Sequence, residues 1–86
     1  MRTVRQQFID RVIIRTLRDC GGYLLPRQAL RDTIDISCQP PVRADEFDDA
    51  LNYAAAQGRI SVANTETGPK YKATEAGLLW AQENRV

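Results

Sequence analysis

The segment from residue 44 to residue 77 constrains the fold of this chain more than any other stretch. Its sequence, ADEFDDALNYAAAQGRISVANTETGPKYKATEAG, begins with apolar residues at spacings of three, one and three, the stripe of an amphipathic helix. These residues are Phe47, Ala50, Leu51 and Ala54. We expect the helix to span about residues 44–57 and to end at Gly58, because glycine adopts the left-handed C-terminal conformation without a Cβ penalty.

Two short runs after that glycine alternate apolar with polar or small residues, as half-buried strands do. The apolar positions are Ile60 and Val62 in the first run, and Tyr71 and Ala73 in the second. The connection between the runs, NTETGP, is rich in turn-forming residues. The sequence therefore predicts a β-hairpin with a polar tip.

A last helix is predicted to follow the hairpin, over about residues 75–84. Thr74 has the side chain of a helix N-cap, and Glu75 lies favourably in the first turn, where a carboxylate interacts with the helix dipole. The apolar residues of this helix are Leu78, Leu79 and Trp80.

The first half of the chain predicts two more helices. The first, over about residues 4–20, has an apolar face and, on the opposite face, three arginines that we interpret as solvated in preference to ligand-contacting. The apolar residues are Phe8, Ile9, Val12, Ile13 and Leu17, and the arginines are Arg11, Arg15 and Arg18. Ile14 lies at the edge of the stripe, where it could extend a contact surface together with Val4 and Trp80.

The second helix is expected to begin with Pro26, whose missing N–H needs no partner in a first turn. Its inward residues are Ala29, Leu30 and Ile34, and a short strand over residues 23–25 precedes it. Residues 35–42 contain Pro40-Pro41 and form a connection that is longer than a tight turn. This loop is either a recognition feature or an insertion that packs Ile36 and Cys38 against the core.

The order of these elements resembles the second half of a winged-helix (winged helix-turn-helix) domain: a helix, a glycine, a hairpin, and a helix that opens with Thr-x-x-Gly. The most specific part of the pattern consists of Leu51, Gly58, Ile60, Tyr71, Thr74 and Gly77. The resemblance implies an α+β fold: a three-helix core, a β-hairpin wing and a C-terminal helix. Residues 1–86 would form one such domain, of the kind found in small bacterial or phage regulators.

Composition indicates a soluble domain, with 43% hydrophobic and 27% charged residues. No apolar run approaches the roughly 20 residues that cross a bilayer. Asp10, Arg11 and Arg15 interrupt the N-terminal segment where a signal sequence would need an apolar core. We therefore expect no membrane association and a cytoplasmic location.

Enzymatic activity is not expected. The chain has no histidine, so it lacks the commonest general base, and its two cysteines cannot complete a zinc site alone. No nucleophile motif is present, and Gly21-Gly22 lacks the later glycines and lysine of a phosphate-binding loop. No cofactor and no metal site are predicted.

The net charge of +1 conceals an uneven distribution. Residues 1–42 hold seven arginines against four aspartates, residues 43–58 hold one arginine against four carboxylates, and residues 59–86 hold four basic against three acidic residues. The predicted third helix is therefore acidic. In DNA-binding winged helices the helix at this position usually enters the major groove, where carboxylates would be repelled by phosphate.

The resemblance nevertheless implies binding to double-stranded DNA by a small transcription regulator, through the third helix, the second helix and the wing. The candidate DNA-contacting residues are Arg27, Arg31, Arg43, Asn52, Tyr53, Arg59, Lys70 and Lys72. Asn52 could pair with adenine, and a carboxylate can accept from cytosine N4. Lys70 and Lys72 share one face of the second wing strand.

The alternative hypothesis is a protein-interaction module on the same scaffold. In this hypothesis Asp45, Asp48 and Asp49 on the third helix bind a basic protein partner. A homodimer is compatible with either hypothesis, because the core of an 86-residue chain is small and many small regulators bind DNA as two-fold dimers.

Overall fold

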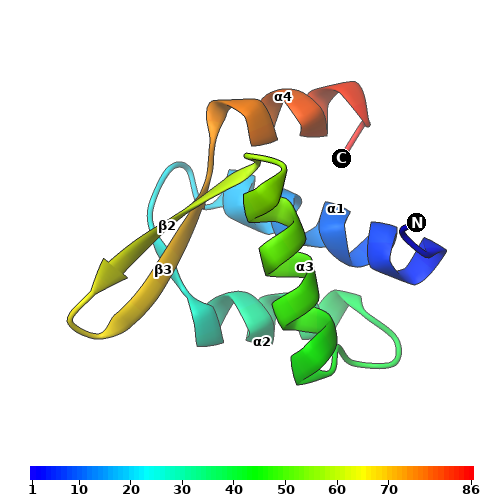
Figure 1. Cartoon of the computed structure of the whole chain (residues 1–86), viewed down its shortest axis with the longest axis horizontal. Coiled ribbons are helices and arrows are strands. Elements are labelled where there is room, and N and C mark those ends of the chain that lie inside the picture. Colours follow the sequence, from blue (N-terminus) through cyan, green and yellow to red (C-terminus); the bar gives the residue numbers. More distant parts are fainter.

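The computed structural model describes residues 1–86 and contains four helices and one three-stranded antiparallel sheet (Figure 1). The elements in chain order are α1 (Val4–Asp19), β1 (Leu25–Pro26), α2 (Arg27–Ser37), α3 (Ala44–Ala56), β2 (Ile60–Thr65), β3 (Gly68–Ala73) and α4 (Glu75–Glu83). The fold is thus α+β, as the sequence predicts. None of the helices is both long enough and apolar enough to cross a membrane.

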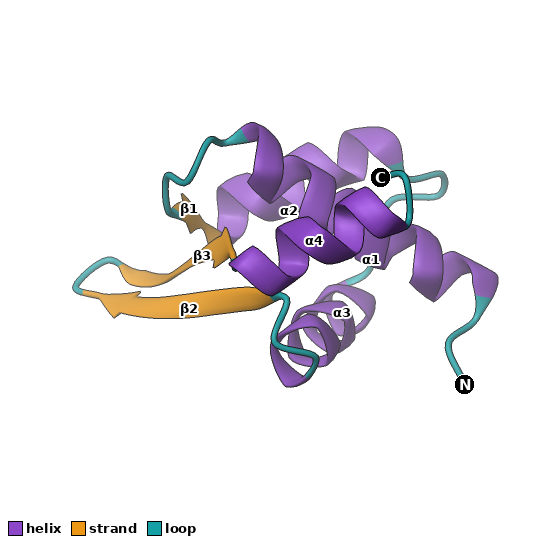
Figure 2. Ribbon diagram, turned by 90° about the horizontal axis from the view of Figure 1, so that it is seen from above, coloured by secondary structure: helices purple, strands orange, loops and turns teal.

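Helix α1 occupies the centre of the molecule, where it contacts α2, α3, α4 and β3 (Figures 1 and 2). A capping box begins it: Thr3 Oγ1 accepts a hydrogen bond from the Gln6 backbone N–H, and Gln6 Oε1 accepts one from the Thr3 N–H. Because other elements surround α1, it buries a wide arc of its surface. The buried residues are Ile9, Asp10, Val12, Ile13, Ile14 and Leu17.

Two expectations for α1 are wrong. Ile14 is only 1% exposed, so it belongs to the core and cannot contribute to a contact surface with Val4. Phe8 is 43% exposed, because it lies on the one narrow side of α1 that no other element covers. The exposed side is the one on which the sequence places Arg11, Arg15 and Arg18, all of them exposed, and Phe8 precedes Arg11 by three residues on that same side.

Helix α3 confirms its sequence pattern. Phe47, Ala50, Leu51 and Ala54 are all buried against the rest of the domain. Gly58 follows with φ of +73°, the left-handed conformation that the sequence predicts after this helix.

The sheet has the strand order β1-β3-β2, with β3 in the middle. Tyr71 of β3 pairs with Val62 on one side and Leu25 on the other, and the hairpin closes at Thr65 and Gly68. Figure 1 shows the hairpin extending away from the helices. Val62 is 45% exposed, contrary to the expectation of a half-buried face, because no helix covers the outer part of β2.

The region around β1 and α2 departs from the prediction in detail. The short strand is Leu25–Pro26 rather than residues 23–25, and Pro26 is the extended N-cap of α2 rather than its first residue. Helix α2 continues to Ser37, which shortens the predicted connection.

Of the two loop residues expected to pack on the core, Cys38 does so, whereas Ile36 is exposed. The sequence predicts an irregular loop for both residues, but Ile36 lies in the last turn of α2 and faces away from α1. Cys20 and Cys38 are free thiols.

The N-terminus of α4 is hydrogen-bonded to the two residues that precede β2. Thr74 Oγ1 accepts from the Gly77 N–H at 3.0 Å, as expected of an N-cap, and donates to the Gly58 carbonyl at 2.6 Å. A Cβ on Gly77 would lie 2.0 Å from the Arg59 carbonyl oxygen, so only glycine allows this approach. The Thr-x-x-Gly pattern therefore joins α4 to the backbone of Arg59.

Candidate nucleic-acid interface

The outward face of α3 carries Asp45, Asp49, Asn52 and Ala56, all of them exposed. It is opposite the buried stripe, and the chain passes from the end of α3 directly into the hairpin. The predicted recognition helix is therefore accessible to a partner along its length.

Each carboxylate of α3 is paired with an arginine of the same chain. The pairs are Arg43 with Asp45 at 3.2 Å, Arg5 with Glu46 at 2.7 Å, Arg27 with Asp48, and Arg2 with Asp49 at 2.7 Å. Two of these arginines precede or begin α1, and one begins α2. The acidic character that the sequence shows for this segment is consequently reduced in the folded protein, where Arg2 is shared between Asp49 and Asp10.

The pair of Arg5 and Glu46 is the most strongly perturbed. Hydrogen bonds from the Arg5 guanidinium, with a further one from the Arg43 backbone N–H, lower the pKa of Glu46 to about 2. The guanidinium of Arg5 also donates to the Pro40 carbonyl at 2.9 Å. Arg5 thereby links α1, the loop before α3 and α3 itself.

Three of the predicted DNA-contacting arginines are engaged inside the chain. Arg27 lies over the Phe47 ring at 4.9 Å from its centroid, and its bond to Asp48 raises the pKa of its guanidinium. Arg31 donates to the Val42 carbonyl at 3.2 Å, and Arg43 is paired as described above. Arg27 therefore bridges α2 and α3, Arg31 bonds α2 to the loop before α3, and the pair of Arg43 and Asp45 lies within the start of α3.

The hairpin lysines have no such partners. Lys70 lies opposite Ala63 and Lys72 opposite Ser61, which places both on the same face of the sheet. Neither lysine takes part in any of the ion pairs of the structure. Their ammonium groups remain available to an external anion.

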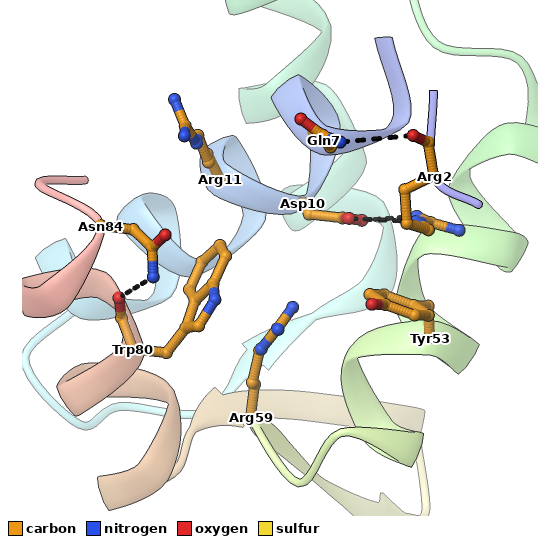
Figure 3. Close-up of a pocket in the computed structure, with 8 residues that line it drawn as sticks. All are labelled: Arg2, Gln7, Asp10, Arg11, Tyr53, Arg59, Trp80 and Asn84. Atoms are coloured by element: carbon orange, nitrogen blue, oxygen red, sulfur yellow. Dashed lines mark hydrogen bonds and ion pairs between the residues drawn. The ribbon is translucent and has the colours of Figure 1, made fainter. Parts of the chain in front are cut away.

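Tyr53 and Arg59 lie apart from the lysines, in a hollow between α1, α3 and α4 (Figure 3). The Tyr53 ring has the Arg2 guanidinium 4.1 Å from its centroid, and Arg59 lies 4.1 Å from the centroid of the Trp80 ring. The eight candidate residues therefore separate into an α2–α3 group, a hairpin pair and a stacked pair in the hollow.

Sequence reasoning missed Arg2 and Arg5 as partners of the third helix. They lie 47 and 41 residues from the carboxylates they contact, and no local pattern links positions so far apart. The only signal in the sequence is the uneven distribution of charge, which is consistent with attraction between the two regions but does not identify the pairs.

The chain matches no protein-family model, and no curated protein or solved structure is significantly similar to it.

Proposed function

We propose that this protein is a winged-helix domain that binds double-stranded DNA and acts as a small transcription regulator. One observation carries the proposal: α3 is exposed with its carboxylates bonded to arginines, and the hairpin that follows it bears two lysines without an ion-pair partner in the chain. α3 would lie in the major groove and the hairpin would contact the phosphate backbone.

The order of elements supports this proposal. A winged helix is expected to contain a helix, a short strand, two helices and a hairpin in this order. Its short strand pairs with the edge of the hairpin, as β1 pairs with β3 here. The chain's helix-turn-helix would consist of α2 and α3, and the wing would consist of β2 and β3. Because one scaffold can serve several functions, the argument for DNA depends on the surface and not on the scaffold.

The ion pairs of α3 weaken the main objection to DNA binding. Four carboxylates on an unpaired helix would be repelled by phosphate, but here each is paired with an arginine, and Asp49 shares its partner Arg2 with Asp10. Asn52 is exposed at the middle of the face and can donate and accept toward an adenine edge. The helix face can thus approach a groove while the lysines supply attraction.

The first test uses a fluorescently labelled pool of random duplexes and measures affinity at several salt concentrations. We expect the double variant Lys70→Ala/Lys72→Ala to bind less tightly and to show a salt slope smaller by about one for each phosphate that the variant no longer neutralises. The matched control is Arg15→Ala/Arg18→Ala, which removes two charges from the exposed side of α1 and should leave the slope closer to that of the wild type. Equal slopes for the wild type and the lysine variant, with unchanged circular dichroism, would remove the hairpin from the interface.

The second test separates DNA binding from the protein-interaction hypothesis. Asp45, Asp48 and Asp49 are changed together to asparagine, which removes three negative charges and releases Arg43, Arg27 and Arg2 from their partners on α3. DNA binding predicts tighter association with random duplexes, and a gain that shrinks as salt rises. Absence of duplex binding by both proteins at low salt would favour the alternative, in which α3 binds a basic protein and the triple change weakens that complex.

A further inference from the structure

The hollow between α1, α3 and α4 is a cavity of about 190 Å³, lined by six polar or charged side chains and by the rings of Tyr53 and Trp80. Its walls come from four separate parts of the chain, which meet only in the folded protein (Figure 3). The lining residues are Arg2, Gln7, Asp10, Arg11, Tyr53, Arg59, Trp80 and Asn84.

Arg59 is the central side chain of this cavity. Figure 3 shows it extending between Trp80 and Tyr53, and its guanidinium lies 4.1 Å and 5.5 Å from the two ring centroids. The Arg59 carbonyl accepts from the Thr74 N–H at 2.9 Å, which fixes the backbone from which the side chain extends. No carboxylate of the chain forms an ion pair with this guanidinium, so its planar set of donors is presented to the cavity without a charged partner.

The one carboxylate in the lining does not neutralise Arg59. Asp10 is 5% exposed and accepts from Arg2 at 2.6 Å and 3.2 Å, so its two oxygens are already bonded. Arg11, on the rim, is also without an ion pair. Arg2 is committed to Asp10 and to Asp49 of α3, so the unpaired positive charge of the lining comes from Arg59 and from Arg11, whose side chain points away from Arg59 (Figure 3).

We propose that this cavity binds a compact oxyanion, the carboxylate or phosphate group of a small molecule, with Arg59 as its main contact. The Arg59 guanidinium lies beside the Trp80 ring, and its planar set of donors can form two parallel hydrogen bonds to such a group. The cavity is smaller than the roughly 300–1,000 Å³ typical of drug-sized ligands, which favours a compact ligand. The site includes Arg59 and Tyr53 from the eight candidate DNA-contacting residues, but its ligand touches neither the hairpin lysines nor Asn52, on which the proposed DNA binding rests.

The test uses the intrinsic fluorescence of Trp80, the only tryptophan of the chain, which lies in the cavity wall. The protein is titrated at constant ionic strength with inorganic phosphate and, separately, with benzoate, and benzamide serves as the uncharged control for benzoate. We expect a saturable change with at least one anion and none with benzamide. The anion that saturates at the lower concentration shows whether the site favours phosphate or carboxylate.

Arg59→Gln should weaken anion binding at least about tenfold, because it removes the charged donor, and Arg11→Gln should weaken it about threefold. Arg15→Gln is the matched control: it removes an exposed arginine of the same helix outside the cavity and should leave binding unchanged. The absence of a saturable signal with both anions would overturn the proposal, as would equal weakening by Arg11→Gln and Arg15→Gln. Circular dichroism shows whether Arg59→Gln still folds. If it does not, the comparison of anion affinity between Arg11→Gln and Arg15→Gln still tests the proposal.

Discussion

Helix α3 and the β2–β3 hairpin follow each other in the chain, but their charged side chains have different surroundings. The carboxylates of α3 are paired with arginines from α1, α2 and the segments around them. Lys70 and Lys72 of the hairpin have no ion-pair partner. The helix is embedded in the domain on its inner side, whereas the hairpin extends away from it (Figure 1).

The comparison teaches that the charge of a segment in the sequence is not the charge that its surface presents. Segment 43–58 has one arginine against four carboxylates, yet each carboxylate meets a guanidinium in the folded chain. None of the elements that contact the hairpin forms an ion pair with Lys70 or Lys72. Its surface charge therefore equals the charge of its own residues.

The largest expected effect tests the difference in packing. Leu51 is 4% exposed, and Leu51→Ala should lower the free energy of unfolding by about 2–5 kcal/mol, because apolar burial decreases and a cavity remains. Val62→Ala in the hairpin should cost less than about 1 kcal/mol, because 45% of that side chain is already exposed. Urea denaturation of the two variants measures the contrast, and similar losses would mean that the hairpin is as tightly packed as the helix.

An intermediate effect concerns which arginines matter for stability. The Arg2 side chain is 16% exposed and pairs with buried Asp10, so Arg2→Ala leaves a buried carboxylate without its partner and should cost about 2–3 kcal/mol. Arg43 is 73% exposed, and Arg43→Ala should change stability by no more than about 0.5 kcal/mol. Thermal unfolding measures the two losses of stability. Equal losses would mean that the burial of Asp10 does not make its pair with Arg2 more stabilising than the exposed pair of Arg43.

The smallest expected effect concerns pH. Because the pKa of Glu46 is lowered from 4.5 to about 2 in the folded protein, its pairing stabilises the fold above pH 4.5, and this contribution is lost as the pH falls through about 2. Water screens the pair at the surface, so Glu46→Gln should cost about 1 kcal/mol at neutral pH, and the difference from the wild type should vanish near pH 2.

The matched control for the pH effect is Glu66→Gln at the exposed tip of the hairpin, where the carboxylate has no ion pair. Its stability should follow that of the wild type at both pH values. A difference between wild type and Glu46→Gln that stays constant from neutral pH to about pH 2 would contradict the assignment of Glu46 as the titrating group.

Much of the fold could be predicted because its signals are local. The stripe of α3, the positive φ at Gly58 and the Thr74 cap each involve residues within one or two turns, and all three are confirmed. The errors occur where neighbours decide burial. Ile14 is a core residue because α1 is surrounded, and Val62 is exposed on β2, an edge strand of the sheet.

The candidate site could be predicted only in part. Side-chain positions along the hairpin follow from alternation, so the sequence predicts the shared face of Lys70 and Lys72. It does not predict the partners of the α3 carboxylates, because ion pairs between distant segments leave no spacing pattern. The cavity around Arg59 likewise needs α1, α3 and α4 together.

Backbone propensity and hydrophobic periodicity act over a few residues, so the sequence predicts which segments are helices and strands, where most of them end, and which face of α3 is buried. Only the tertiary structure decided that Arg2, Arg5 and Arg27 balance the acidic helix, and that Arg59 lies between two aromatic rings without an ion-pair partner. Electrostatic interactions depend on distance in space, and distance in space between remote residues is set by packing of the whole chain.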